Sequence, residues 1–215
     1  MRLTFAVTAL ALAVIVAGAE EKSRTMTFAK TDSGMLPAGW KAEKTGKGEG
    51  SVWKVVEDGT SPSGTGYVLA QTAAGPGALF NLCIAEDTSF KDGEISVAFK
   101  AVRGEKDQGG GIVWRYKDHN NYYIARMNPL EDNFRVYKVV DGKRIQLQTK
   151  EDLKVKAGEW HTLKIAIAGD QIQCSLDGEK HLEANDSTFQ APGKVGLWTK
   201  ADAQTYFDNL KITSK

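Results

Sequence analysis

The sequence has few cysteines, no excess of charge of either sign and, after its first 19 residues, no long apolar run. Its two cysteines permit a single disulfide. No later segment approaches about 18 consecutive apolar residues, so we expect no transmembrane helix. The 28 basic and 27 acidic side chains nearly balance. A net charge near zero argues against nucleic acid or an anionic membrane surface as the partner.

The first 19 residues, MRLTFAVTALALAVIVAGA, have the composition of a leader. One basic residue, Arg2, precedes an apolar run that ends at Ala17-Gly18-Ala19. This pattern predicts a secretory signal peptide cleaved after Ala19, and a secreted or periplasmic mature protein. Residues 20–27 are expected to be a loose, charged lead, and residues 28–215 are long enough for one β-sandwich domain.

The two cysteines, Cys83 and Cys174, lie in the strand-like runs LFNLCIA and IQCSL. Beyond a secretory leader, a disulfide between them is possible, and closing a loop of about 90 residues contributes roughly 4 to 5 kcal/mol if the bridge is unstrained. Two separate buried thiols explain the same pattern equally well. Both interpretations stay open at this point.

No segment after the leader shows a sustained helical period, and short alternating runs predict roughly 12 to 14 strands. Residues 94–102 alternate cleanly, with Ile95, Val97, Phe99 and Ala101 on one side. Asp-Gly pairs at 141–142 and 177–178 predict hairpin turns. A change of phase between Phe207 and Leu210 predicts a bulge. The sequence is therefore all-β, and Trp53, Trp160 and Trp198 are expected to fill its core.

The stretch GGGIVWRYKDHNNYYIARMNPLEDNFRVYKVV, residues 109–140, predicts three consecutive strands with two polar turns. If its more apolar rows face inward, the other rows share one outer surface. That surface would carry Arg115, Arg126, Arg135, Tyr122, Tyr137 and Asn128. Planar guanidinium groups can bind the hydroxyls or carboxylate of a saccharide while a tyrosine stacks on its apolar face. The alternative is that the arginines pair with Glu94, Glu131, Asp132 or Asp208 and only cover the sheet.

Several motifs resemble a known family in the order in which they occur. GGIVWRYKDHNNYYIARMN, FRVYKVVDGKR, AGEWHTLKIAIAGDQIQCSLDG, GKVGLWTK and YFDNLKI are similar to concanavalin A-like and laminin-G-like jelly rolls. More narrowly, they resemble the secreted bacterial 3-keto-disaccharide hydrolase domain family, whose members include many glycoside hydrolases assigned by similarity. The resemblance covers roughly residues 28–213. It implies a two-sheet antiparallel jelly roll whose concave sheet holds a sugar. It also implies that this sheet contains residues 94–102, 109–116, 122–128 and 134–140.

A glucanase-type active site is not expected. Retaining enzymes of this superfamily carry Glu-x-Asp-x-x-Glu on one strand, which places two carboxylates on the same face about 5 Å apart. The nearest match here begins at Glu105 but ends at Gly110, in loop-like surroundings. If the protein is an enzyme, the acids near enough in sequence to the predicted surface are Glu94, Asp118, Glu131 and Asp132. The sequence does not choose among them.

No cofactor is expected, and the signals for metals are weak. His119, His161 and His181 lack metal-ligand spacing. Asp58 and Asp208 are oxygen donors of the kind that hold structural Ca²⁺, which needs six or more ligands. The glycines at 109–111 lack the Lys-Ser/Thr of a phosphate loop, so they indicate close approach of a ligand or a neighbouring strand.

These observations favour a secreted carbohydrate-active protein that uses the concave sheet to bind or hydrolyse a saccharide. The competing hypothesis is a non-catalytic, laminin-G-like domain for protein interaction or envelope structure, because fold alone does not fix function.

Overall fold

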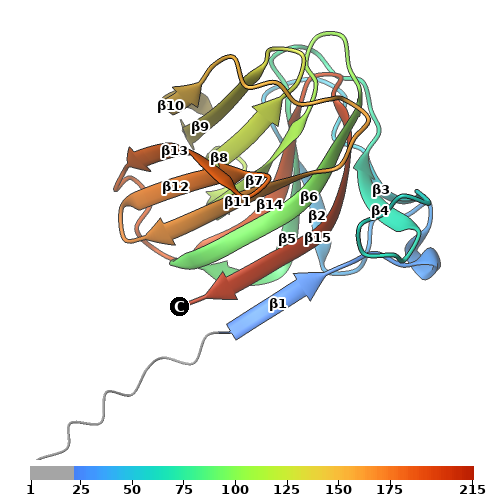
Figure 1. Ribbon diagram of the computed structural model, residues 1–215, viewed down its shortest axis with the longest axis horizontal. Helices are drawn as coiled ribbons and strands as arrows, with labels where there is room; N and C mark the ends of the chain where they lie inside the picture. The colour runs from blue at the N-terminus through green and yellow to red at the C-terminus, as the bar shows by residue number, and fades with distance from the viewer. Residues whose placement is uncertain (1–21) are drawn as a thin grey trace, which may run out of the picture.

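The computed structural model describes residues 22–215, which form two antiparallel sheets packed face to face (Figure 1). The back sheet has the order β13-β12-β11-β6-β15-β4-β3, with β1 also paired to β15, and the concave sheet has the order β10-β9-β8-β7-β14-β5-β2. The strands are β1 Lys22–Met26, β2 Trp40–Thr45, β3 Trp53–Glu57, β4 Tyr67–Gln71, β5 Phe80–Phe90, β6 Gly93–Arg103, β7 Gly110–Asp118, β8 Asn121–Asn128, β9 Asn133–Val140, β10 Lys143–Lys150, β11 His161–Ala168, β12 Gln171–Leu176, β13 Glu179–Asn185, β14 Gly193–Lys200 and β15 Gln204–Ser214. The only helix described is a single 3₁₀ turn, Lys30–Asp32. The predicted all-β, two-sheet antiparallel jelly-roll fold is confirmed.

The main core lies between the two sheets, where the alternating apolar rows meet. From the concave sheet it receives Ile112 and Trp114 of β7, and from the back sheet Ile95 and Val97 of β6. All four side chains are fully or almost fully buried. Burial of apolar surface at this interface is the main favourable contribution to folding, at roughly 25 cal/mol per Å². The inward-facing rows predicted from alternation are confirmed.

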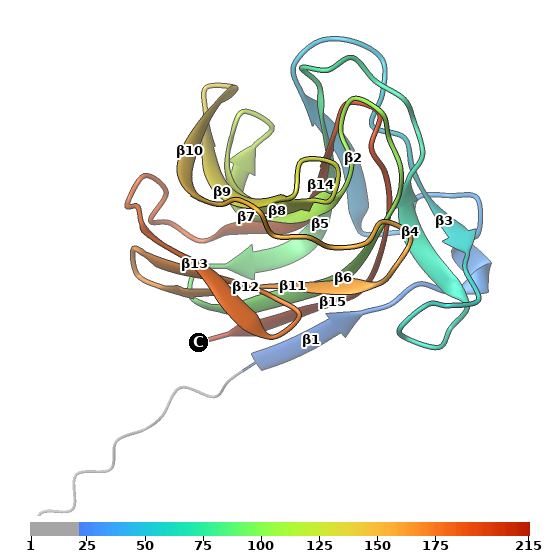
Figure 2. The ribbon, with the colours of Figure 1, turned by 45° about the horizontal axis from the view of Figure 1, so that its top comes forward.

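The concave sheet is strongly curved, with β10 and β2 rising at its two edges (Figure 2). The curvature brings distant strands together, since Thr45 Oγ1 of β2 lies 2.8 Å from the hydroxyl of Tyr122 in β8. A second apolar cluster therefore fills much of the outer face. It comprises Phe80, Leu82, Ile84, Val113, Tyr116, Tyr122, Ile124, Tyr137, Val139 and Trp198. The expected polar platform is thus partly a second, smaller core.

Two expectations about the strands are wrong. Residues 94–102 belong to β6, which pairs with β11 and β15 in the back sheet and not in the concave one. The chain changes sheets after β6, through the loop of residues 104–109. The lead predicted to be loose contains β1, whose five residues pair with residues 210–214 of β15. Backbone pairing orders this segment although its side chains are mostly exposed.

The turn and bulge predictions are confirmed. Asp141 and Gly142 have φ values of 49° and 75°, and Asp177 and Gly178 have values of 49° and 86°. Two successive positive φ angles are what a two-residue type I′ hairpin requires. The register of β15 against β6 shifts between Asp208 and Lys211, at the position where the alternation changes phase.

Both cysteines are free and buried. Cys83 lies in β5 of the concave sheet and Cys174 in β12 of the back sheet. The sequence left open a disulfide or two separate buried thiols, and the structure has two separate buried thiols. Burial raises the pKa of both thiols, that of Cys174 to about 12, so neither is a reactive thiolate at neutral pH.

Candidate functional site on the concave face

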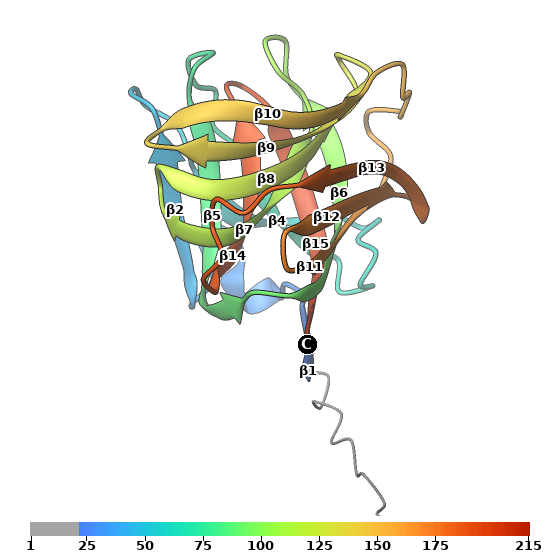
Figure 3. The ribbon, with the colours of Figure 1, turned by 90° about the vertical axis from the view of Figure 1, so that its left-hand side faces the viewer.

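One line of paired residues crosses the concave sheet from β2 to β10 and carries the site. Figure 3 shows the strands that it crosses. In register, it reads Glu43, Leu82, Trp198, Gly111, Arg126, Arg135 and Thr149. Paired residues of neighbouring antiparallel strands point to the same face. Gly111 has no side chain because a Cβ there would collide with the carbonyl of Ala125. The close approach of a neighbouring strand thus explains this glycine. Gly111 lies between Trp198 and Arg126 in the line.

Arg126 is buried at the centre of this line and is held by three neighbours. Its Nη1 donates to Asn133 Oδ1 at 2.5 Å, and its Nη2 donates to Glu131 Oε2 at 2.9 Å and to the Tyr137 hydroxyl at 3.3 Å. Its Nε has no partner among the residues described. The side chain is therefore fixed in place with one donor left over.

Arg135 lies beside Arg126 and is more exposed. Its Nη2 donates to Glu151 at 3.0 Å, its Nε donates to Thr149 at 3.1 Å, and its Nη1 lies 3.7 Å from Glu131. Glu131 thus lies between two guanidinium groups and offsets their repulsion. The predicted alternative of pairing with acidic residues is found here, with Glu131 as the shared partner.

Arg115 does not join this surface, so that part of the prediction is wrong. It has a positive φ of 45°, and the register of β7 against β8 shifts between Trp114 and Asp118. This irregularity turns the side chain away from the concave face. Its guanidinium donates to the carbonyls of Lys91, Gly169 and Phe189 and to Asp92 Oδ1, at 2.7 to 3.1 Å. Arg115 therefore ties loops together.

Of the four acids predicted as catalytic candidates, only Glu131 contacts the site. Glu94 lies on the back sheet, 2.8 Å from Lys164. Asp118 accepts hydrogen bonds from Asn120 and Asn121 and closes the β7–β8 turn at the other end of β7. Asp132 has a positive φ of 50° in the β8–β9 turn, where its carbonyl accepts a hydrogen bond from Leu153.

The structure brings in an acid that the sequence analysis passed over, Asp107 in the loop before β7. It is 3 % exposed, accepts a hydrogen bond from Asn128 at 3.1 Å and pairs with Lys200 at 2.8 Å. Burial raises the pKa of Asp107, and the ion pair with Lys200 offsets this only in part. The run Glu105-Lys106-Asp107 supplies the first two carboxylates of the glucanase motif, Glu-x-Asp-x-x-Glu. Gly110 stands where the third carboxylate would be, so the sequence alone does not point to Asp107.

Glu131 has the opposite electrostatic character. Partial burial raises its pKa, but Arg126, Asn133 and Arg135 together outweigh burial, so the pKa lies below its ordinary value. Asp107 and Glu131 are thus two carboxyl groups whose pKa values are pushed apart. In such a pair, the group with the raised pKa can hold a proton and the group with the lowered pKa can accept one.

Asp202, in the turn before β15, holds the loop that presents Asp107. Its carboxylate accepts hydrogen bonds from the backbone N–H groups of Glu105, Lys106 and Asp107 at 3.0 to 3.1 Å. Partial burial raises the pKa of Asp202, but these three backbone donors outweigh it and lower the pKa. A carboxylate held by several N–H groups is a stable charged anchor.

Arg144 of β10 is a second group that sequence analysis missed. Its Cζ lies 4.5 Å from the ring centroid of Tyr137, 5.1 Å from that of Phe80 and 5.9 Å from that of Trp198. Trp198 itself was expected in the main core but faces this cluster. Arg144 follows the Asp-Gly turn, and its position opposite Val139 places it on the same face as Tyr137.

Four buried side-chain nitrogens have no hydrogen-bond partner among residues 22–215, and three of them lie on this face. They are Arg126 Nε, Arg144 Nη1 and Trp198 Nε1; the fourth, Trp114 Nε1, is in the main core. The N–H of Trp198 lies close enough to the Tyr122 hydroxyl to act on the pKa of that tyrosine, so the donors of Arg126 and Arg144 are the freer ones. All three are donors without acceptor capacity. Leaving a buried donor unpaired costs about 1 to 3 kcal/mol, so the face is suited to a ligand rich in acceptor oxygens.

The remaining predicted binding residues have structural partners. Tyr122 is fully buried in the second apolar cluster and bonds to Thr45. Asn128 accepts hydrogen bonds from the backbone of Leu130 and Glu131, which shapes the turn, while it donates to Asp107. Both side chains lie in β8 together with Arg126 and help to hold the site in shape.

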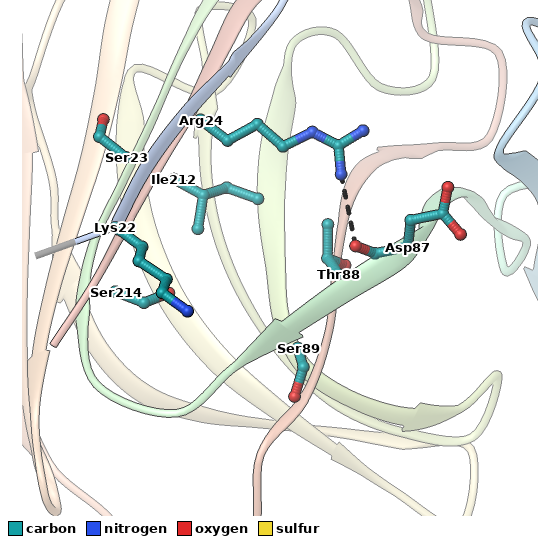
Figure 4. Close-up of a pocket in the computed structure, with 8 residues that line it drawn as sticks. All are labelled: Lys22, Ser23, Arg24, Asp87, Thr88, Ser89, Ile212 and Ser214. Atoms are coloured by element: carbon teal, nitrogen blue, oxygen red, sulfur yellow. Dashed lines mark hydrogen bonds between the residues drawn. The ribbon is translucent and has the colours of Figure 1, made fainter.

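A cavity of about 150 Å³ between β1 and β5 is a weaker candidate (Figure 4). Its lining has one carboxylate, Asp87, and the guanidinium of Arg24 already donates to the carbonyl of that residue at 3.4 Å. Lys22, Ser23 and Ser214 line the rest of its polar wall. No unpartnered buried donor lies there among the residues described.

The calcium candidates are engaged by the protein itself. Asp58 accepts hydrogen bonds from Lys100 and Thr60, and Asp208 accepts one from the backbone of Ser63. Within residues 22–215 no group of three or more His, Cys, Asp or Glu side chains is arranged to hold a metal ion. No helix in that range is long and apolar enough to cross a membrane.

Fold and site together define a class, the jelly rolls with a polar and aromatic concave face. The chain is similar to the carbohydrate-binding module CBM66 from Bacillus subtilis, with 19% identity, a TM-score of 0.65, and coverage of 86% of this chain and 99% of that one. It is also similar to a glycoside hydrolase family 16 endo-glucanase from Bacteroides ovatus, with 14% identity, a TM-score of 0.58, and coverage of 85% and 98%. At these identities the likeness shows the fold.

The family follows from the sequence itself. The model of the 3-keto-alpha-glucoside-1,2-lyase-like domain matches residues 31–213, so the chain belongs to this family. No curated protein matches the chain. The resemblance to the 3-keto-disaccharide hydrolase domain family predicted from the motifs is confirmed.

Proposed function

We propose that this protein is a secreted, carbohydrate-active domain that holds a saccharide on its concave face, against Arg126, Arg144 and Trp198. One observation carries the proposal, namely that Arg126 and Arg144 each keep a buried donor without a partner, with the Trp198 ring 5.9 Å from the Cζ of Arg144. Saccharides offer many acceptor oxygens, and their C–H faces stack on aromatic rings. The predicted leader, which supports secretion, lies among residues 1–21, outside the residues described.

The family suggests what such a site can catalyse. In a 3-keto-glucoside, the ketone acidifies the hydrogen on the neighbouring carbon C2. A base removes this proton, the electron pair forms a double bond to C1, the C1–O bond breaks, and the leaving oxygen takes a proton. Glu131, with its lowered pKa, suits the base, and Asp107, with its raised pKa, suits the acid. The free donor of Arg126 would stabilise charge on the ketone oxygen.

A second candidate is binding without turnover. Both carboxylates already have partners, since Glu131 is held by Arg126 and Asp107 by Lys200. A base that is bonded to a guanidinium is a weaker proton acceptor. This observation favours a lectin-like module that uses the same face.

The test uses a 3-keto-α-glucoside and the parent glucoside with the wild-type protein and three variants. Elimination predicts that Glu131→Gln and Asp107→Asn each lower turnover by at least about 100-fold while binding changes much less. Glu94→Gln on the back sheet is the matched control and should have no effect. Binding that depends on Arg126 without turnover would establish the lectin-like alternative. Absence of binding to any saccharide in a broad panel would contradict the proposal and favour an interaction domain.

A further inference from the structure

We infer that the saccharide group received by Arg144 is anionic, a carboxylate such as that of a uronic acid. The inference rests on the proposed function, since it concerns the ligand of the same face. It adds the charge of that ligand, which follows from the way in which the cations of the face are paired.

Every other cation of the face has an acidic partner. Arg126 pairs with Glu131 at 2.9 Å, Arg135 with Glu151 at 3.0 Å and Lys200 with Asp107 at 2.8 Å. Arg144 takes part in no ion pair among residues 22–215, and its Nη1 is buried without a hydrogen-bond partner. The positive charge of Arg144 is therefore the one on this face that its own chain leaves without a contacting counter-ion.

The surroundings of Arg144 explain how it can receive an anion. Three aromatic rings, of Tyr137, Phe80 and Trp198, lie within 6 Å of its Cζ. Cation–π contacts stabilise the charge but accept no N–H hydrogen bond in the guanidinium plane. A planar carboxylate matches two parallel N–H groups of a guanidinium, which a single hydroxyl or ketone oxygen does not.

The electrostatics of the unliganded face point the same way. Burial lowers the pKa of Arg144, and the charge of Arg126 acts in the same direction. Asp107, Glu131 and the Tyr137 hydroxyl act against that shift but do not contact the guanidinium. A bound anion would supply the missing contact, while the two carboxylates stay engaged by Lys200 and Arg126.

The experiment compares three probes on one scaffold by calorimetric titration. These are methyl α-D-glucopyranoside, the corresponding methyl α-D-glucuronide, and the methyl ester of that glucuronide, which removes the charge at the same carbon. We expect the wild-type protein to bind the glucuronide at least tenfold more tightly than either neutral probe, with a preference that shrinks as salt rises. Equal affinity for the glucuronide and its methyl ester would overturn the inference without any variant.

Two variants assign the preference to Arg144. Arg144→Gln should reduce the preference for the glucuronide over the two neutral probes to about one, and Arg144→Lys should recover part of it. Arg135→Gln is the matched control, because Arg135 lies on the same face with its own acidic partners, and it should keep the preference. A preference that survives in Arg144→Gln, with folding checked by near-UV circular dichroism, would overturn the assignment.

The outcomes for the two proposals are separable. If neutral or 3-keto probes bind through Arg126 and Trp198 but the glucuronide has no advantage, the anionic ligand is wrong and the proposed function stands. If no probe of any kind binds, both are wrong.

Discussion

At the scale of single residues, the three arginines predicted to act together have different roles. Arg126 and Arg135 lie side by side on the concave face, whereas a backbone irregularity turns Arg115 toward the loops. Simple alternation places all three on one surface, since it assumes an unbroken pleat. One residue with a positive φ is enough to break that assumption.

The loop-tying role of Arg115 predicts an effect on stability and none on binding. Arg115→Ala would leave three carbonyls and Asp92 without their donor, so the free energy of unfolding should fall by about 2 to 4 kcal/mol. Arg135→Ala, at a partly exposed position, should cost less than about 1 kcal/mol. Urea unfolding measures both. Loss of saccharide affinity in Arg115→Ala at unchanged stability would contradict this role.

The raised pKa of Asp107 predicts a pH-dependent penalty. Its ordinary value is 3.8, and burial raises it in the folded protein. Below pH 3.8 the carboxyl is protonated in both states. As the pH rises from there through the raised pKa, the carboxyl ionises less readily in the folded state than in the unfolded state. Ionisation therefore favours the unfolded state, and this group makes the protein less stable. Each unit of elevation corresponds to about 1.4 kcal/mol.

Asp107→Asn, which cannot ionise, measures that penalty. Its free energy of unfolding relative to wild type should rise between pH 3 and pH 7 in urea titrations. Asp208→Asn, another fully buried aspartate but on the back sheet, controls for general effects of substitution. A difference between Asp107→Asn and wild type that stays constant, or falls, would show that Asp107 is not held with a raised pKa.

At the scale of elements, the loop of residues 104–109 and its anchor decide where the acid lies. Asp202→Ala would release three backbone N–H groups, and amide hydrogen exchange at Glu105, Lys106 and Asp107 should speed up by at least about tenfold. Asp202→Asn keeps one acceptor oxygen and should show a smaller change. Exchange rates that stay as in wild type would mean that the loop is held by other contacts.

The strands could be predicted from the sequence because their patterns are local. Alternation, Asp-Gly turns and the change of phase in β15 were each visible within about ten residues. The assignment of β6 to the back sheet was not, since an apolar row fits either inner face. Asp107 and Arg144 were missed for a related reason. Asp107 lies in a loop, and Arg144 is separated from Phe80 by four intervening strands. Only the curvature of the sheet brings Arg144 over that ring.

At the scale of the whole molecule, the two layers are held together by packing and hydrogen bonds, and no disulfide links them among residues 22–215. Cys83 and Cys174 lie in opposite sheets as free thiols, so the midpoint of thermal unfolding should be the same with and without a reducing agent. Native protein should resist iodoacetamide because burial raises both thiol pKa values. Unfolded protein should take up two labels by mass spectrometry. A protein that takes up no label after unfolding would contain the disulfide instead.

The two sheets differ in the side chains that their outer faces carry. The back sheet packs one face on the core and turns the other outward, while the curved sheet has apolar rows on both faces and gathers its unpaired donors on the outer one. Acceptor-rich ligands should therefore bind to the concave sheet and leave the back sheet unchanged. The indoles of Trp198 and Trp160 report on the two sides, since Trp160 donates to Thr60 next to the back sheet.

The most direct measurement is a nuclear magnetic resonance titration of the side-chain N–H signals with a 3-keto-α-glucoside. Occupation of the concave face predicts that the Nε–H of Arg126, which lacks a partner in the unliganded protein, and the Nε1–H of Trp198 on the same face shift most. The Nε1–H of Trp160 should stay where it is. Shifts confined to Trp160 and the back sheet, with Trp198 and Arg126 unmoved at saturation, would contradict the account.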